Sequence, residues 1–220
     1  MTDAATTDTV TLDVLDRWVR LSDARLTTEA DHLTALDSAI GDADHGTNML
    51  RGFTAIVAKL DATPPQSVPE FFKAVGMTLV SKVGGASGSL YGTLFLDMGK
   101  NAPAGASMSA AQWAHALSAG VAAVVARGHA QPGDKTMIDA FAPALTALEA
   151  ALSGGATLAA AAAAAADAAE QGSADTEPLV ARKGRASYLG ERSAGHVDPG
   201  SASTALLLRA FADAAAGEAA

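Results

Sequence analysis

The 220-residue sequence contains no cysteine, and only 5% of its residues are aromatic. Without cysteine the chain can form no disulfide and use no thiol chemistry, which is compatible with a reducing cytoplasm. Basic residues are also scarce, because 15 Lys and Arg stand against 24 Asp and Glu, and the net charge is −9. Proteins that bind nucleic acid need a basic face, so we expect no nucleic-acid partner.

Long apolar runs are missing as well. A membrane-spanning helix needs about 18 or more predominantly apolar residues, and the nearest candidate is the alanine-rich stretch 156–169. Alanine is only weakly hydrophobic, and Asp167 interrupts this stretch. The first residues are polar and acidic and lack the pattern of a signal peptide. We therefore expect a cytoplasmic protein with no membrane partner.

Helical periodicity is what the sequence does show. Hydrophobic residues make up 49% of the chain, enough for one domain with a substantial core. Apolar positions recur at helical spacing, and no segment shows the alternation of a strand. We expect an all-α fold of about eight antiparallel helices over residues 11–220, behind a flexible segment at 1–10. The expected helices are 11–36 (with or without a break near Ser22), 46–60, 67–83, 90–101, 109–128, 135–152, 157–171 and 199–214.

An acidic turn follows the first expected helix. Asp37, Asp42 and Asp44 lie within eight positions of one another, and we expect Gly41 to end the helix in a left-handed conformation. Such a turn would let the three carboxylates converge, and converging carboxylates need a hard cation such as Mg²⁺, Mn²⁺ or Ca²⁺. The alternative is a solvated acidic loop in which Asp44 caps the next helix.

Four glycine-bearing interruptions separate the helices, at 41–46, 84–88, 128–133 and 195–200. Antiparallel helices return alternate junctions to the same end, so these loops could gather into one site. Segment 84–88 precedes a helix, and its exposed backbone N–H groups and the helix dipole would suit a phosphate. The alternative for this segment is a helix break that allows close packing.

Segment 128–136 is similar to a phosphate-binding Walker A loop but departs from it. Asp134 is inserted between Gly133 and Lys135, and the segment follows a helix where a P-loop follows a strand. We exclude a P-loop and expect Asp134 to cap the following helix.

Segment 182–192 concentrates four of the 15 basic residues in eleven positions. It is either a solvated charge run or a structured loop that presents Arg185 to an anion, since Arg matches phosphate oxygens bidentately. His45, His129 and His196 could each transfer a proton, accept a phosphoryl group or make a structural hydrogen bond. An acidic cluster beside phosphate-binding loops favours nucleotide phosphoryl transfer.

Taken together, these motifs resemble the L-subunit family of dihydroxyacetone kinases, the nucleotide-binding subunits of the phosphotransferase-system-dependent type. The resemblance rests on segments 36–46, 84–88, 132–137 and 182–193, in that order, and runs from about residue 12 to 214. It implies an eight-helix antiparallel barrel with the nucleotide at one end.

The resemblance also implies site residues. The three carboxylates match the family's ligands for two Mg²⁺ ions. Positions that match its nucleotide contacts are His45, Gly46, Thr47, Asn48, Ala86, Ser87, Gly128, Met137, Arg185, Asp198, Pro199 and Gly200. Arg185 is the implied phosphate-positioning residue, and no other catalytic role is assigned. Whether Arg185, Lys183 or Lys135 contacts the transferred phosphate is left open.

Partners are implied in the same way. The family transfers the γ-phosphate of Mg-bound ATP to dihydroxyacetone held on a separate K subunit. A phospho-His protein, the M subunit, then rephosphorylates the bound ADP. A homodimer is also compatible with the sequence. The alternatives are a split ATP-dependent triose or tetrose kinase that exchanges free ATP, a non-catalytic module that binds a partner according to its nucleotide state, and a plain structural domain.

Overall fold

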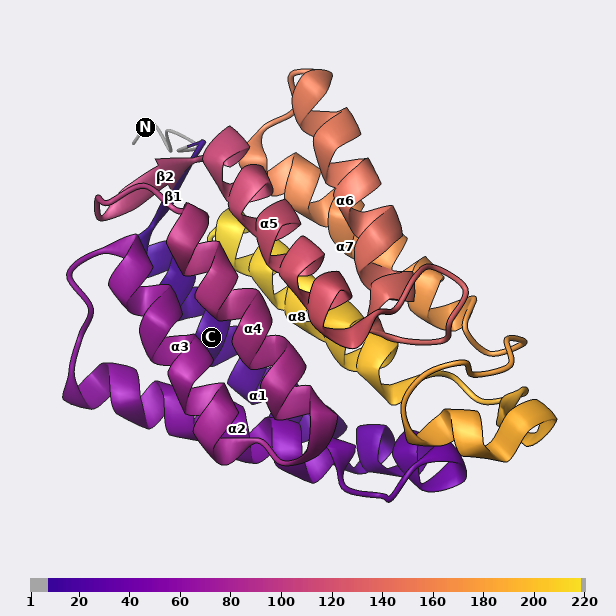
Figure 1. The fold of residues 1–220 in the computed structure, drawn as a ribbon. Helices are drawn as coiled ribbons and strands as arrows, with labels where there is room; N and C mark the ends of the chain where they lie inside the picture. Colours follow the sequence, from indigo (N-terminus) through magenta and orange to yellow (C-terminus); the bar gives the residue numbers. More distant parts are fainter. Residues whose placement is uncertain (1–7, 219–220) are drawn as a thin grey trace.

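The computed structural model describes residues 8–218 and is all-α, as the sequence predicts (Figure 1). In that part of the chain, eight α-helices are accompanied by one 3-10 helix and two short strands. The elements are β1 (Thr9–Thr11), α1 (Leu12–Ile40), α2 (His45–Ala62), α3 (Val68–Lys82), α4 (Gly85–Asn101), β2 (Ser107–Ser109), α5 (Ala110–Gly128), α6 (Met137–Ser153), α7 (Leu158–Ala174), η1 (Arg185–Ser193) and α8 (Pro199–Ala216).

The α-helices form a closed ring in which the order around the ring is the order along the chain. Each helix packs against the next one in the sequence, and α8 packs against α1. Neighbouring helices run in opposite directions (Figure 1), and most connections are short, although the one from α7 to α8 is longer and contains η1. The predicted helical barrel is therefore confirmed, and α2, α4, α6 and α8 all begin at one end of it.

Aromatic side chains fill the middle of the barrel. The rings of Trp113 and Phe211 are stacked with their centroids 3.8 Å apart, and the ring of Trp18 meets Trp113 edge-on at 5.2 Å. The indole N–H of Trp18 donates to the carbonyl of Leu207 at 2.8 Å, which ties α1 to α8. The middle of the barrel is thus a packed core.

The alanine-rich helix α7 packs closely between α6 and α8. Ala161, Ala165 and Ala169 are buried, and a Cβ at Gly172 would lie 2.3 Å from the carbonyl oxygen of Asp139 on α6. Small side chains allow this approach, and alanine favours the helix itself. Within residues 8–218, no helix has both the length and the apolar character to cross a membrane.

The two short strands were not predicted. Strands β1 and β2 pair in an antiparallel arrangement, and the fully buried Val10 lies opposite Met108. Residues 1–10 were expected to be flexible, and this expectation is wrong for Thr9 and Val10, which belong to β1. Residues 1–7 lie outside the described residues. Three-residue strands are too short to show the alternation from which strands are predicted.

Helix ends agree with the expected ones only in part. Asp198 caps α8 by accepting the backbone N–H of Ser201 at 2.7 Å. Asp134, however, does not cap α6. That helix begins two residues later than expected, because Thr136 and Asp139 form a reciprocal capping box. Helix α1 is continuous through Ser22.

Candidate active site

A cavity of about 450 Å³ opens at the end of the barrel where α2, α4, α6 and α8 begin. All four glycine-bearing interruptions contribute to its wall. They supply Gly41, Asp42, Asp44, His45, Gly84, Gly85, Ala86, Ser87, Gly128, Ala130, Asp198, Pro199 and Gly200. The prediction that these loops gather into one site is therefore confirmed.

Helix N-termini suit this end of the barrel for an anion, because each directs the positive end of its dipole toward the cavity. Helix α4 begins at Gly85, five residues earlier than expected, so Ala86 and Ser87 lie in its first turn. Gly85 has φ +64, a conformation that favours glycine, and a Cβ at Gly88 would lie 2.1 Å from the carbonyl oxygen of Val83. The glycines of segment 84–88 thus allow both a turn before α4 and close packing of the backbone.

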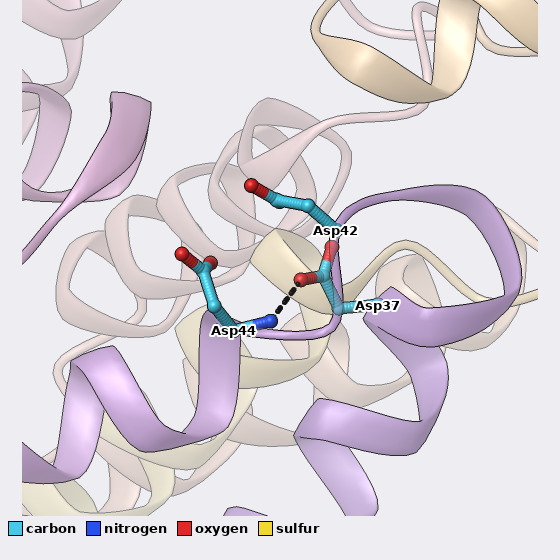
Figure 2. A group of neighbouring side chains, drawn as sticks. All are labelled: Asp37, Asp42 and Asp44. Atoms are coloured by element: carbon cyan, nitrogen blue, oxygen red, sulfur yellow. Dashed lines mark hydrogen bonds between the residues drawn. The ribbon is translucent and has the colours of Figure 1, made fainter.

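The three carboxylates of the acidic turn converge (Figure 2). One oxygen of each of Asp37, Asp42 and Asp44 lies within 4.8 Å of the other two. Asp37 is buried, and its Oδ2 accepts the backbone N–H groups of Asp44 at 2.9 Å and His45 at 3.1 Å. The Asp44 side chain makes no capping hydrogen bond, so the alternative in which it caps α2 is not observed. Oxygen donors in this arrangement fit a divalent cation such as Mg²⁺.

Gly41 ends α1, but not in the expected left-handed conformation. Its φ is −140° and its ψ is −136°, and the positive φ of the turn falls on Ala43 instead. Gly41 is needed for space, because a Cβ there would lie 2.0 Å from Oδ1 of Asp37. The missing side chain lets the Asp37 carboxylate fold over the end of its own helix.

His45 joins three of the helix N-termini. Its Nδ1 is 3.1 Å from Oγ of Ser87 on α4, and its Nε2 is 2.8 Å from Oγ of Ser203 on α8. Burial lowers the pKa of His45, which favours the neutral imidazole. The hydroxyl of Tyr91, whose pKa burial raises, is 2.8 Å from the same Ser203 hydroxyl. Sequence reasoning missed Tyr91 and Ser203, although Tyr91 is one helical turn from Ser87.

The three residues after His45 do not line the cavity. A Cβ at Gly46 would lie 2.0 Å from a carbonyl oxygen of α1, so this glycine allows α2 to pack on α1. Thr47 is exposed. Asn48 is buried, and its Oδ1 accepts a hydrogen bond from Arg51, which leaves its amide N–H₂ group beside Gly84. The nucleotide contacts expected of Gly46, Thr47 and Asn48 therefore remain predictions.

One wall of the cavity is apolar. Its side chains are Ile40, Leu90, Val124, Ala130, Met137 and Ile138. Such a surface suits the flat face of a base, next to the predicted contacts Gly128 and Met137. Arg127 lies at the edge of this wall, where its Nε donates to Oγ of Ser89 at 2.6 Å. Neither Arg127 nor Ser89 was predicted as a site residue.

Segment 182–192, the basic arm, is a structured loop. It turns at Gly184, which has φ +64, and continues as η1. Figure 1 shows the arm beside the junction of α1 and α2. Nη2 of Arg185 lies 3.1 Å from Oδ2 of Asp42, and Lys183 and Arg185 both line the cavity. The predicted presentation of Arg185 toward an anion therefore has a suitable geometry, although Arg182, Arg185 and Arg192 are all exposed.

The other candidate side chains differ in whether they could reach a ligand in the cavity. Lys135 lines the cavity but is only 1% exposed, and its ammonium donates to backbone carbonyls. His129 and His196 are exposed and do not line the cavity. Asp198 does line it, and burial, with contributions from Asp139 and Asp37, raises its pKa to about 7.

Comparison with known proteins identifies close relatives. The DAK2 domain family matches residues 39–213. The "PEP-dependent dihydroxyacetone kinase, ADP-binding subunit DhaL" of Escherichia coli K12 is 42% identical over 198 residues, covering 90% of this chain and 94% of that protein. The "PTS-dependent dihydroxyacetone kinase, ADP-binding subunit DhaL" of Lactococcus lactis is 39% identical, covering 94% of this chain and all of that protein.

Two longer proteins are also similar. Human "Triokinase/FMN cyclase" is 38% identical over 182 residues, 82% of this chain and 31% of that protein. The solved dihydroxyacetone kinase from C. freundii, in complex with AMP-PNP and Mg²⁺, superposes with a TM-score of 0.69 at 30% identity. This match covers 90% of the chain described here, which spans about a third of the C. freundii chain.

Proposed function

The chain belongs to the DAK2 domain family, and we propose that it is the ADP- and ATP-binding subunit of a dihydroxyacetone kinase. In this proposal it transfers the γ-phosphate of Mg-bound ATP to dihydroxyacetone held by a separate K subunit. One observation carries the proposal. The acidic turn, the N-termini of four helices and Arg185 all face a single cavity.

Each part of the cavity has a role in this function. Asp37, Asp42 and Asp44 would hold two Mg²⁺ ions together with phosphate oxygens, and the metal would offset the charge of the phosphates. The first turn of α4 would bind phosphate oxygens through backbone N–H groups. Arg185 would position the transferred phosphate, since its guanidinium can bind two oxygens at once. The apolar wall would hold the base.

The relatives support a division of labour between subunits. Two of them are named as ADP-binding subunits of PEP- or PTS-dependent kinases, over nearly their whole length. We propose that bound ADP stays in place and is rephosphorylated by a phospho-His protein, the M subunit. A cytoplasmic location and a homodimer belong to the same proposal, and the mass of the purified protein in solution tests the homodimer.

Reconstitution tests the proposal directly. The purified chain is mixed with a K subunit, dihydroxyacetone and Mg²⁺, with either the phosphorylated M subunit or ATP as the phosphoryl donor, and dihydroxyacetone phosphate is measured. We expect product with the parent chain and none with Asp42→Ala. If the mixture with the parent chain forms no product while the chain still binds ADP, a nucleotide-dependent regulatory module is the better description.

A second candidate is a split ATP-dependent kinase of a triose or tetrose. The similarity to human "Triokinase/FMN cyclase" favours it, because that relative is named for a triose kinase activity. Mass analysis of the chain purified without added nucleotide separates the two. Retained ADP supports the phosphotransferase-system-dependent type, and an empty chain that turns over free ATP supports the split kinase.

A further inference from the structure

Lys135 is a buried charged residue that the proposed chemistry does not use. Its side chain is 1% exposed, although lysine is almost never fully buried unless it is paired. Its backbone has φ +62. Two hydrogen bonds hold the loop that carries it, since the Asp139 carboxylate accepts the backbone N–H groups of Gly133 and Thr136. The ammonium group therefore projects from a hydrogen-bonded loop just before α6.

The ammonium group of Lys135 binds only backbone carbonyls. Nζ donates to the carbonyl oxygens of Thr176 at 2.8 Å, Leu179 at 3.1 Å, Glu177 at 3.3 Å and to that of His196. A lysine has three N–H donors, so four acceptors leave none for a phosphate. Burial lowers the pKa of Lys135, whereas nearby Asp198, Glu177 and Asp139 favour its charged form.

These acceptors lie on the two sides of the basic arm. Thr176, Glu177 and Leu179 come before the arm, and His196 comes after it. We call residues 176–179 and 195–196 the neck of the arm. One ammonium group thus joins both sides of the neck, next to a backbone hydrogen bond of 2.8 Å from Gly195 N–H to the Glu177 carbonyl.

Beyond the neck, the arm has few apolar contacts with the barrel. Among the described residues, its hydrophobic contact with the barrel is a small cluster formed by Ile40, Ala181, Ala186 and Leu189. The arm also donates one backbone hydrogen bond, from Arg182 to the carbonyl of Asp134, at 3.0 Å. Since so little surface is buried, the direction of the arm depends strongly on how its neck is held.

We propose that Lys135 is a positioning residue that closes the neck and thereby holds Arg185 over the cavity. The effect of Lys135 on nucleotide binding rests on the function proposed above. The closure of the neck by Lys135 does not rest on that function, because it follows from contacts within the chain alone. Lys135 acts through the arm and does not contact the phosphate.

Hydrogen exchange of the parent protein without nucleotide is the first test. The backbone N–H groups of Arg182 and Gly195 should be protected before any ADP is added. Exchange of these amides at the unprotected rate until ADP binds would show that the nucleotide orders the neck, and the proposal would fail. This measurement needs no variant, and it is informative even if the chain does not bind ADP.

A double-mutant cycle is the second test. In Lys135→Met, the neck amides should exchange at least about tenfold faster, while the amides of the helices keep their protection. ADP binding in Mg²⁺ should weaken about tenfold, as it does in Arg185→Met, and the double variant should bind no more weakly than Arg185→Met. Lys100→Met, at an exposed lysine paired with Asp97, is the matched control and should change neither measurement.

Two results of the cycle would overturn the proposal. One is an unchanged exchange rate at the neck of Lys135→Met. The other is a loss of ADP affinity that adds in full to the loss in Arg185→Met, since this would place Lys135 on the nucleotide itself. Should Lys135→Met fail to fold, the exchange of the parent protein decides.

Discussion

Arg185 of the basic arm lies 3.1 Å from Asp42 of the acidic turn, although the two residues are far apart in the sequence. Their side chains are 68% and 37% exposed, and ion pairs at such exposed positions stabilise a fold by only about 0–1 kcal/mol. The pair is therefore more informative about the site than about stability, because it places a cation and a proposed metal ligand at the same opening.

Replacing Arg185 should separate binding from stability. Arg185→Met is expected to leave the Tm nearly unchanged and to weaken ADP binding in Mg²⁺ by about tenfold or more, because a charge-assisted contact to phosphate is lost. Calorimetric titration with ADP measures the effect. Arg192→Met, which removes another exposed cation of the arm, should bind ADP almost as the parent does, and equal losses in both variants would contradict this role.

Removing one carboxylate of the acidic turn should abolish the response to Mg²⁺. For the parent, Mg²⁺ with ADP should raise the Tm, since a ligand of the folded state stabilises it. Asp42→Asn should lose this rise. Without metal it should be at least as stable as the parent, because like charges within 4.8 Å repel each other.

Asp61→Asn is the matched control for the metal experiment. Asp61 is a surface carboxylate that pairs with Arg20 and lies outside the cavity. A thermal denaturation series over Mg²⁺ concentration should give the parent response for this variant. If Asp42→Asn responds to Mg²⁺ like the parent, the metal assignment is wrong.

Gly46 should matter for packing of the helices. A Cβ at this position would lie 2.0 Å from the Ala30 carbonyl oxygen and 2.7 Å from Oγ1 of Thr34. Overpacking of this kind costs about 1–3 kcal/mol, so chemical denaturation of Gly46→Ala should show a loss of that size. Gly105→Ala, where the nearest atoms are 3.8 Å away, should unfold like the parent.

Asp198 should make stability depend on pH. Its pKa is raised from 3.8 to about 7, chiefly by burial, so between these values the folded state binds a proton that the unfolded state releases. The free energy of unfolding should therefore fall as the pH rises from about 4 to about 7. Asp198→Asn keeps a cap for α8 and should show a flatter profile. Parallel profiles for the two proteins would contradict the shift.

Much of the fold follows from the sequence, because helices are local. Periodicity and caps predicted all eight α-helices, and Ser109 and Asp198 begin helices as expected. The errors have physical causes. Asp134 was expected to cap α6, but Thr136 caps it because Asp139 completes the capping box. The strand at Val10 depends on its pairing with Met108, which local sequence does not encode.

The site was predictable only in part. The acidic turn, segment 84–88 and the basic arm stand out as motifs, but the sequence could not assign Lys135. It remained a candidate phosphate ligand until the structure showed its ammonium bound to four carbonyls. Tyr91 and Ser203 were missed, because their importance comes from hydrogen bonds between three helices, from Tyr91 to Ser203 and from Ser203 to His45.

By itself, the sequence determined the all-α class, the positions of the helices and the three carboxylates that precede α2. These features depend on spacing, capping and composition within a few residues of each other. Only the tertiary structure decided that four helix N-termini and the basic arm surround one cavity. Closing the ring with α8 against α1 brings Asp198 and Arg185 to the acidic turn, and such long-range contacts arise from packing of the whole barrel.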